Sequence, residues 1–225
     1  MRREIVDYYD SLAPHYDEAR FANSYGRFVD ACEKQILRAW LPSDPKHTLE
    51  LGSGTGRLSA FAAIATDASK PSLAIARTRN HATRFVAADA ERLPFPPASF
   101  DAVFAFHLLM HLEVEAIGAI FAESFRVLRP GGLFIADIAS KTRRRLTGRH
   151  KTKDAWHAQT ALTRRAFEDI ARATGFTPSR MTGLLLLPIH RLPDRARQPL
   201  AHLDACLAQR LPSLSSYLVA GFAKP

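Results

Sequence analysis

The stretch LELGSGTGRL, at residues 49–58, constrains the possible fold of this chain more than any other. Gly52, Gly54 and Gly56 stand at alternate positions directly after an apolar, strand-like segment. Glycines let the backbone bend tightly and let a ligand approach main-chain N–H groups that a Cβ would block. A helix beginning after the turn adds free N–H donors and a positive dipole end. The pattern predicts a nucleotide-type site; a tight strand–helix loop without a ligand is the alternative.

Strand-like apolar segments alternate with helical ones through the middle of the chain, which predicts a parallel, doubly wound α/β sheet. We expect strands at residues 47–51, 62–66, 84–88, 101–106 and 133–137, with helices at 56–61, 70–79 and 113–128. Ser69 is suited to cap the second of these helices. After the fifth strand we expect a helix at 164–174, a strand at 180–187, a helix at 199–210 and a last strand at 216–222.

Two helices are expected before the first strand, at residues 2–13 and 24–40, with an aromatic segment between them. In the second helix Phe28, Cys32 and Trp40 belong to a series at four-residue spacing, which indicates one apolar face. Because this part precedes the first strand, we expect it to pack on the edge or the top of the sheet.

Composition places the chain among soluble globular proteins. Its 225 residues suffice for one domain with a sizeable core. The net charge of +9 permits nucleic acid, a membrane surface or an acidic substrate as partner, although such a charge can also serve solubility alone. Cys32 and Cys206 are too few for a disulfide framework or a metal cluster, so no metal is expected. Without a signal-peptide pattern or a bilayer-long apolar run, we expect a cytoplasmic protein.

Polar residues stand at several of the expected strand ends. In an open α/β sheet the ligand lies beyond the carboxyl ends of the strands, and Asp67, Asp89 and Asp137 occupy three of them. A carboxylate after the second strand can accept hydrogen bonds from ribose hydroxyls. Asp89 could hold an adenine amino group. Each residue could instead cap a helix, but their order after the glycine turn favours a ligand site.

Four segments carry a resemblance to a known family: LELGSGTG at 49–56, DAS at 67–69, DAERLPF at 89–95 with SFD at 99–101, and RVLRPGG at 126–132. Over about residues 47–137 the chain resembles class I S-adenosylmethionine-dependent methyltransferases, in the small-molecule branch that includes ubiquinone and menaquinone methylases. The resemblance implies a seven-stranded, mostly parallel, Rossmann-like sheet with a C-terminal antiparallel strand and an N-terminal helical lid. It also implies methyl transfer from S-adenosylmethionine to an O, N or C nucleophile of a small molecule, with S-adenosylhomocysteine as product.

The resemblance also implies roles for individual residues. The methionine part of the cofactor would be surrounded by Glu50, Gly52, Ser53, Gly54, Gly56 and Phe106; the ribose would be held by Asp67 with Ala68; adenine would be read by Asp89 and Ala90; and Tyr16 would reach the cofactor from the lid. The single domain then divides into the lid at 1–45, a cofactor-binding half at 46–138 and a substrate-side half at 139–225. We expect a monomer or a homodimer.

One spacing departs from this pattern. Only ten residues, 57–66, separate Gly56 from Asp67, and they must hold both a helix and a strand. A comparable ribose carboxylate stands roughly 20 residues after its glycine turn. About five residues remain for the helix, little more than one turn. We therefore expect a truncated helix or strand and a first face of the sheet that is partly uncovered.

Several residues could act on a methyl acceptor. A phenol, amine or enol nucleophile can need a base, and the candidates at the strand ends are His107, His111 and Asp137. His111 could instead cap or pack under the next helix, and His107 could be an exposed loop residue. Candidates for binding the acceptor, including one that bears a phosphate or carboxylate, are Arg143 in the basic segment 141–153, Trp156, His157 and His190. The alternatives are a solvated loop and a packing anchor.

Three other functions are alternatives to this one. An RNA methyltransferase is compatible with the net charge, but no Asn-Pro-Pro-aromatic motif, strand-end cysteine or separate RNA-binding domain supports it, so a nucleic-acid partner is not favoured. A non-catalytic cofactor-binding scaffold would fit the shortened segment after Gly56. A nicotinamide dehydrogenase is disfavoured because the chain has no Tyr-x-x-x-Lys motif.

Overall fold

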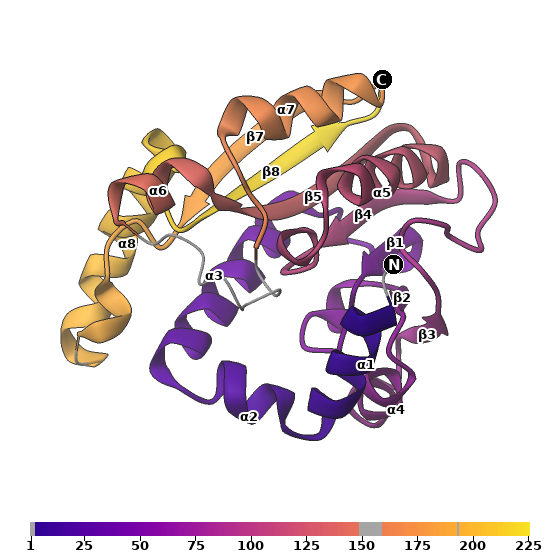
Figure 1. Cartoon of the computed structure of the whole chain (residues 1–225), viewed down its shortest axis with the longest axis horizontal. Helices are drawn as coiled ribbons and strands as arrows, with labels where there is room; N and C mark the ends of the chain where they lie inside the picture. The colour runs from indigo at the N-terminus through magenta and orange to yellow at the C-terminus, as the bar shows by residue number, and fades with distance from the viewer. Residues whose placement is uncertain (1–2, 149–158, 193) are drawn as a thin grey trace.

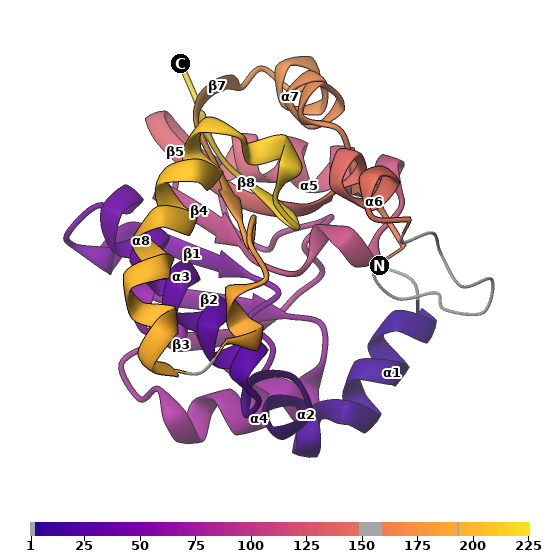
Figure 2. The same cartoon turned by 90° about the vertical axis from the view of Figure 1, so that its left-hand side faces the viewer.

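An eight-stranded sheet runs through the molecule with helices on both faces (Figures 1 and 2). This computed structural model describes residues 3–148, 159–192 and 194–225. Seven strands follow the order β3-β2-β1-β4-β5-β8-β7, and β6 pairs with β5 outside that path. The strands are β1 Thr48–Leu51, β2 Ile64–Asp67, β3 Arg84–Ala87, β4 Phe100–Ala105, β5 Leu128–Ser140, β6 Ala161–Leu162, β7 Thr177–Leu184 and β8 Tyr217–Ala223.

The strand directions confirm the predicted doubly wound, mostly parallel sheet. β8 alone is antiparallel to its neighbours, β5 and β7, in the part of the chain that the structure describes. Two details differ from the prediction. The two-residue β6 is too short to leave a periodic pattern in the sequence. β5 begins at Leu128, ahead of the expected break at Arg129, because Leu128 pairs with Phe100.

Eight α-helices are described: α1 Arg3–Leu12, α2 Tyr16–Phe21, α3 Ser24–Trp40, α4 Lys70–Arg79, α5 Val114–Val127, α6 Lys141–Leu146, α7 Arg164–Ala173 and α8 Asp194–Arg210. One face of the sheet is covered by α5 and α7 (Figure 2). There the Phe121 ring lies 5.0 Å from the Phe134 ring and 5.2 Å from the Phe222 ring, each edge to face. Such aromatic contacts add about 0.5–1.5 kcal/mol each to the burial of apolar area. This cluster forms the centre of the core.

The opposite face carries α3, α4 and α8. The expected truncation after Gly56 is confirmed, because only a 3-10 turn, Ser59–Phe61, stands between β1 and β2. The face is nevertheless not left uncovered. Leu37 of α3 is fully buried and shares an apolar cluster with Leu58 and Ala62, which flank this turn, and with Phe104 of β4. The expectation that the N-terminal part packs only on the edge or top is therefore wrong for α3, which fills the space of a crossover helix.

The first two helices lie at the carboxyl ends of the parallel strands, as expected of a lid (Figure 2). α1 and the 3-10 turn Ala13–His15 pack against α4. Asp17 of α2 accepts a hydrogen bond from Thr55 Oγ1 at 2.8 Å and forms an ion pair with Arg79 of α4. These contacts fasten the N-terminal segment to the glycine turn. Among the described residues, no helix has the length and apolar character needed to cross a membrane.

Candidate functional site

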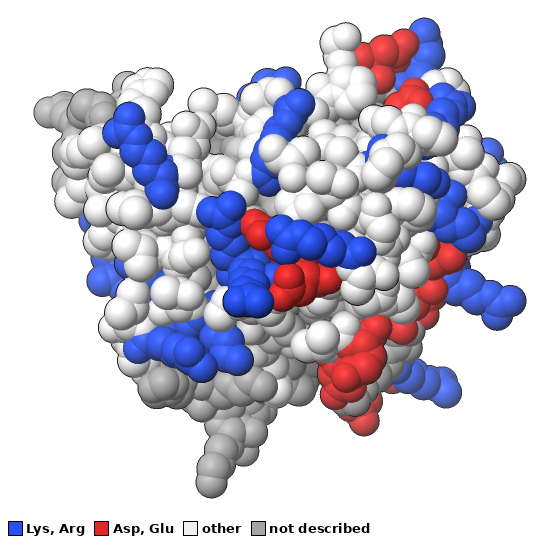
Figure 3. All heavy atoms as spheres, turned by 90° about the horizontal axis from the view of Figure 1, so that it is seen from above, with Lys and Arg blue, Asp and Glu red and all other residues white. Residues whose placement is uncertain are grey.

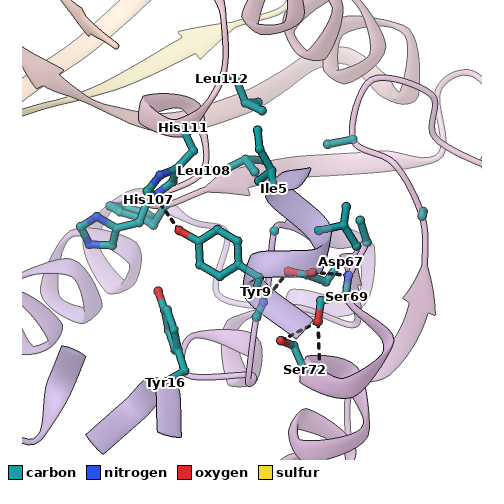
Figure 4. Close-up of a pocket in the computed structure, with 17 residues that line it drawn as sticks. Ile5, Tyr9, Tyr16, Asp67, Ser69, Ser72, His107, Leu108, His111 and Leu112 are labelled. Carbon is teal, nitrogen blue, oxygen red and sulfur yellow. Dashed lines mark hydrogen bonds between the residues drawn. The ribbon is translucent and has the colours of Figure 1, made fainter. Parts of the chain in front are cut away.

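A cavity lies at the carboxyl ends of β1, β2 and β4, between these ends and α1 (Figure 4). It contains about 740 Å³ of space, part of which is open to solvent. Its wall combines main-chain atoms of the glycine turn, the carboxylate of Asp67, the rings of Tyr9 and Tyr16, and the loop after β4. The cavity is therefore where an open α/β sheet is expected to bind its ligand.

The glycine turn presents its backbone to this cavity. Gly54 has a φ of +53°, and a Cβ on it would meet no protein atom within 4 Å, so the space beside it is open. Gly56, with a φ of +83°, is needed for packing instead, because a Cβ there would come within 2.9 Å of Ala76 in α4. The turn thus combines one glycine that leaves room for a ligand with another that lets a helix approach.

Asp67 connects the turn to the next helix. Its Oδ2 accepts a hydrogen bond from Gly54 N at 2.7 Å, and its Oδ1 accepts one from Ser69 N at 2.8 Å. Burial nevertheless raises the pKa of this carboxyl above its usual range, because the backbone donors only partly offset the lost hydration. Ser69 Oγ accepts from Ser72 N at 3.2 Å, which confirms the predicted helix cap. Ala68 also lines the cavity.

The predicted cofactor residues divide into two groups. Gly52, Gly54, Asp67, Ala68, Ala90, Phe106 and Tyr16 line the cavity, whereas Glu50, Ser53, Gly56 and Asp89 are not among its lining residues. Glu50 is buried on the α3 face of β1, where its Oε2 accepts from Ser59 Oγ at 2.5 Å. Burial raises the pKa of Glu50 to about 8. Asp89 accepts from Glu91 N at 3.0 Å and separates two alanines whose atoms reach the cavity.

Tyr9 and His111 meet across the cavity. Tyr9 Oη lies 3.0 Å from His111 Nε2, and the Tyr9 ring lies 6.0 Å from the ring of Tyr16 (Figure 4). Burial raises the pKa of Tyr16 to about 12, so both phenols that line the cavity stay neutral near pH 7. His111, a predicted catalytic candidate, therefore lies in the cavity, while Tyr9 and Ile5 were missed. Their four-residue spacing on one helix face was the available signal.

A buried charged cluster adjoins the cavity beside His107. His107 Nε2 lies 2.5 Å from Glu33 Oε1, and its Nδ1 lies 3.6 Å from Asp137 Oδ2. Arg57 pairs with the other oxygen of Glu33 at 2.6 Å and with Asp30 at 2.8 Å. Two of the predicted catalytic candidates, His107 and Asp137, are thus brought together, and His107 is mostly buried rather than exposed in a loop.

The cluster contains two residues that the sequence analysis missed, Glu33 and Arg57. Glu33 is 1% exposed and stands four residues from two fully buried neighbours, Val29 and Leu37. An acidic residue within the apolar stripe of a helix was therefore the signal that could have identified it. Arg57 directly follows the glycine turn, and its guanidinium carbon lies 4.1 Å from the centre of the Phe21 ring.

Electrostatics explain how these charges are tolerated. Burial by itself would lower the pKa of His107, but the carboxylates of Glu33 and Asp137 outweigh it and raise that pKa above its usual value. Burial likewise opposes the charged form of Glu33, but His107 and Arg57 hold its pKa below the usual range. Burial raises the pKa of Asp137 to about 6. The cluster therefore contains a histidine flanked by two carboxylates that favour its protonated form.

Among the predicted acceptor-binding residues, Arg143 is the one whose side chain lies in the described part of the structure. Arg143 lies in α6, where its main-chain N–H donates to Ser140 Oγ at 3.2 Å, and it does not line the cavity. Trp156 and His157 lie outside the described residues, as does the side chain of His190. Within the described part of the chain, no group of three histidine, cysteine, aspartate or glutamate residues could hold a metal ion.

The central part of the chain is similar to known proteins. Residues 49–136 match the family described as a methyltransferase domain. A demethylmenaquinone methyltransferase of Thermus thermophilus is 34% identical over 142 residues, covering 56% of this chain and 62% of that protein. A malonyl-[acyl-carrier protein] O-methyltransferase of Marinomonas sp. is 34% identical over 151 residues, covering 60% and 54%. This chain thus spans only a little over half the length of these two curated relatives.

The fold as a whole also has a solved counterpart. A SAM-dependent methyltransferase of Thermotoga maritima, titled a possible histamine N-methyltransferase, superposes with a TM-score of 0.74. The superposition covers 98% of this chain and 99% of that one, at 19% sequence identity. At this identity the likeness concerns the fold, and it includes the N-terminal helices and the C-terminal antiparallel strand.

Proposed function

We propose that this protein is a class I S-adenosylmethionine-dependent methyltransferase, which transfers a methyl group from this cofactor to a small molecule; the match of residues 49–136 to the methyltransferase-domain family supports this. The acceptor would present an oxygen, nitrogen or carbon nucleophile, and the second product would be S-adenosylhomocysteine. The observation that carries the proposal is the open main-chain surface at Gly54, which lies beside the carboxylate of Asp67 at the carboxyl ends of the strands.

The residues present suit such a cofactor. We assign the methionine part to the glycine turn and to Phe106, and the ribose hydroxyls to Asp67, whose carboxylate already accepts two backbone hydrogen bonds. We assign adenine to the backbone around Ala90. Tyr9 and Tyr16 would close the cavity from the lid, and their aromatic faces suit a positively charged sulfonium.

Methyl transfer from a sulfonium requires mainly alignment and the exclusion of water. The cofactor supplies an activated methyl group, and the protein supplies an apolar wall of lid residues around the reacting atoms. His111 is our candidate for the base. The 3.0 Å separation between its Nε2 and Tyr9 Oη indicates that a hydroxyl group in this cavity can reach the nitrogen. His107 is less suited to this role, because carboxylates flank both of its ring nitrogens.

On the face of the molecule that Figure 3 shows, the distribution of charge favours a small acceptor over nucleic acid. On the face shown in Figure 3, lysines and arginines stand in separate groups, some of them beside acidic residues. Arg164, Arg172 and Arg165 of α7 each form an ion pair with Glu168 or Asp169. Proteins that bind a nucleic-acid backbone present a continuous basic stripe instead. We infer that the net charge serves solubility or an acidic small molecule.

The proposal is tested by calorimetric titration with S-adenosylmethionine, using Gly54→Ala and Gly131→Ala as a matched pair. Both glycines have a positive φ, +53° and +78°, and neither has an atom within 4 Å of an added Cβ, so the backbone strain is similar. Of the two glycines, only Gly54 lines the cavity. We expect Gly54→Ala to weaken binding at least about tenfold, or about 1.4 kcal/mol, and Gly131→Ala to leave it unchanged.

Two outcomes would contradict the proposal. Absence of binding to the wild-type protein at millimolar cofactor would exclude it, and so would equal affinities of the two glycine variants. A screen of metabolite fractions with methyl-labelled cofactor then identifies the acceptor. The screen also includes tRNA. If the protein binds the cofactor but labels no small molecule, label on tRNA would favour the RNA methyltransferase, and absence of label from every fraction would favour the scaffold function.

A further inference from the structure

Glu33 is a buried carboxylate with a position that packing alone does not explain. It comes from α3, which supplies apolar residues to the core, yet its side chain is 1% exposed and charged. Burying an unpaired carboxylate is expensive, so such a residue persists only with strong partners. Its two oxygens have different partners: Oε2 pairs with Arg57 at 2.6 Å, and Oε1 faces His107 at 2.5 Å.

His107 is held on its other side by Asp137. The main-chain N–H of His107 donates to Asp137 Oδ1 at 2.7 Å, and the ring Nδ1 lies 3.6 Å from Asp137 Oδ2. The residue has a φ of +56°, a left-handed conformation that is uncommon outside glycine. The backbone and the ring of His107 therefore both contact carboxylates.

The loop that His107 occupies forms part of the cavity wall. Phe106, His107 and Leu108 all line the cavity. A Cβ built on Gly52 would lie 3.1 Å from Leu108, so this loop packs directly against the glycine turn. A displacement of His107 would move Leu108 relative to the turn and change the shape of the site.

We propose that Glu33 is a positioning residue that acts through His107, holding its ring and the loop after β4 against the cofactor cavity. The structural part of this proposal stands on the contacts alone, whereas its effect on the cofactor rests on the proposed function. The glycine turn and the strand-end motifs contain no residue of α3. With Glu33 in this role, α3 contributes to the site as well as to the core.

The proposal predicts a direction for the pH dependence of cofactor binding. Glu33, Asp137, Arg57 and Tyr217 are the titratable groups that face the His107 ring, and the two carboxylates raise its pKa. The protonated ring stabilises the folded protein, and this contribution is complete below the ordinary histidine pKa. It is lost as the pH rises through the raised pKa of His107 in the folded protein. Cofactor affinity should therefore fall on the alkaline side.

Glu33→Gln and Asp30→Asn are a matched pair for the test. Asp30 pairs with the same guanidinium as Glu33, at 2.8 Å from Arg57 Nη1. Among the ion pairs of the described residues, however, Asp30 has none with His107. A 15N-histidine NMR titration, with the signal assigned from His107→Gln, measures protonation without any need for activity. We expect Glu33→Gln to lower the His107 midpoint by about 1–3 pH units, and Asp30→Asn to leave it within about 0.3.

Calorimetry with S-adenosylmethionine provides the second measurement. The alkaline loss of affinity should move to lower pH in Glu33→Gln by the same amount as the NMR midpoint, and should be absent in His107→Gln. If Glu33→Gln does not fold, Glu33→Asp retains the charge on a shorter side chain and should give a smaller shift in the same direction.

Particular results would overturn the inference. It is wrong if the His107 midpoint is unchanged without the Glu33 carboxylate, or if Asp30→Asn lowers it equally, since the effect would then pass through Arg57. An NMR shift in a protein that binds no S-adenosylmethionine refutes the proposed function but supports the Glu33–His107 pair. Cofactor binding with a pH dependence that Glu33→Gln leaves in place refutes the role of Glu33.

Discussion

The place of α3 in the core can be tested with Leu37→Ala. Leu37 is fully buried in the cluster that covers the shortened crossover between β1 and β2. Truncating a buried leucine costs about 2–5 kcal/mol, from lost transfer free energy and the cavity left behind. Taking about 3 kcal/mol, and about 2–4 °C for each kcal/mol in a protein of this size, Tm should fall by about 6–12 °C.

The control is Leu203→Ala in α8. Leu203 is 48% exposed, so the same substitution in a helix should change the free energy of unfolding by no more than about 0.5 kcal/mol. Unfolding is followed by far-UV circular dichroism for the whole protein and by Trp40 fluorescence for α3, in a background in which Trp156 is replaced by phenylalanine. If α3 belongs to the core, both probes report one transition in wild type and variant.

A different result would refute this reasoning. If α3 is a detachable part of a lid at residues 1–45, Trp40 fluorescence will change at a lower temperature than the circular dichroism signal. Leu37→Ala will then lower the first transition and leave the second within about 1 °C of wild type. The prediction therefore decides whether the proposed lid ends before α3 or includes it.

Two further predictions concern charges at the site. Because burial raises the pKa of Glu50 to about 8, the folded protein holds a proton that the unfolded chain loses near pH 4.5, and stability falls as the pH rises between these values. Glu50→Gln should remove this loss. In urea unfolding, the free energy of unfolding of the variant should exceed that of wild type at pH 9 by on the order of a few kcal/mol and should match it near pH 4. An unchanged pH slope would contradict the raised pKa of Glu50. His111→Gln should reduce label transfer to a hydroxyl acceptor by about 10²–10⁴-fold while cofactor affinity stays within about threefold, and undiminished transfer would exclude His111 as the base.

Much of the cofactor side could be predicted from sequence because its signals are local. Alternating glycines after an apolar strand specify a turn, and Asp67 follows the next strand, so parallel pairing brings the two together whatever the rest of the chain does. Ser69 was identified as a cap for the same reason, since capping involves residues only three apart. The truncated helix followed from counting residues between Gly56 and Asp67.

Two of the predicted cofactor residues, Glu50 and Asp89, are not among the residues that line the cavity. Glu50 and Asp89 stand in segments that resemble the family, yet Glu50 bonds Ser59 on the α3 face and Asp89 bonds its own turn. For Glu50, alternation along β1 decides which face of the sheet its side chain occupies. Their proposed roles therefore depend on mutational tests.

By itself, the sequence determined the α/β class, the mostly parallel sheet and the short crossover after the glycine turn. These depend on periodicity, on glycine conformations and on chain length, which are properties of neighbouring residues. Only the tertiary structure decided that α3 replaces the missing crossover helix, and that Glu33 and His107, 74 residues apart in sequence, form one buried charged pair. Such contacts join residues distant in sequence, and they form because a buried charge requires a partner and an uncovered sheet face requires an apolar one.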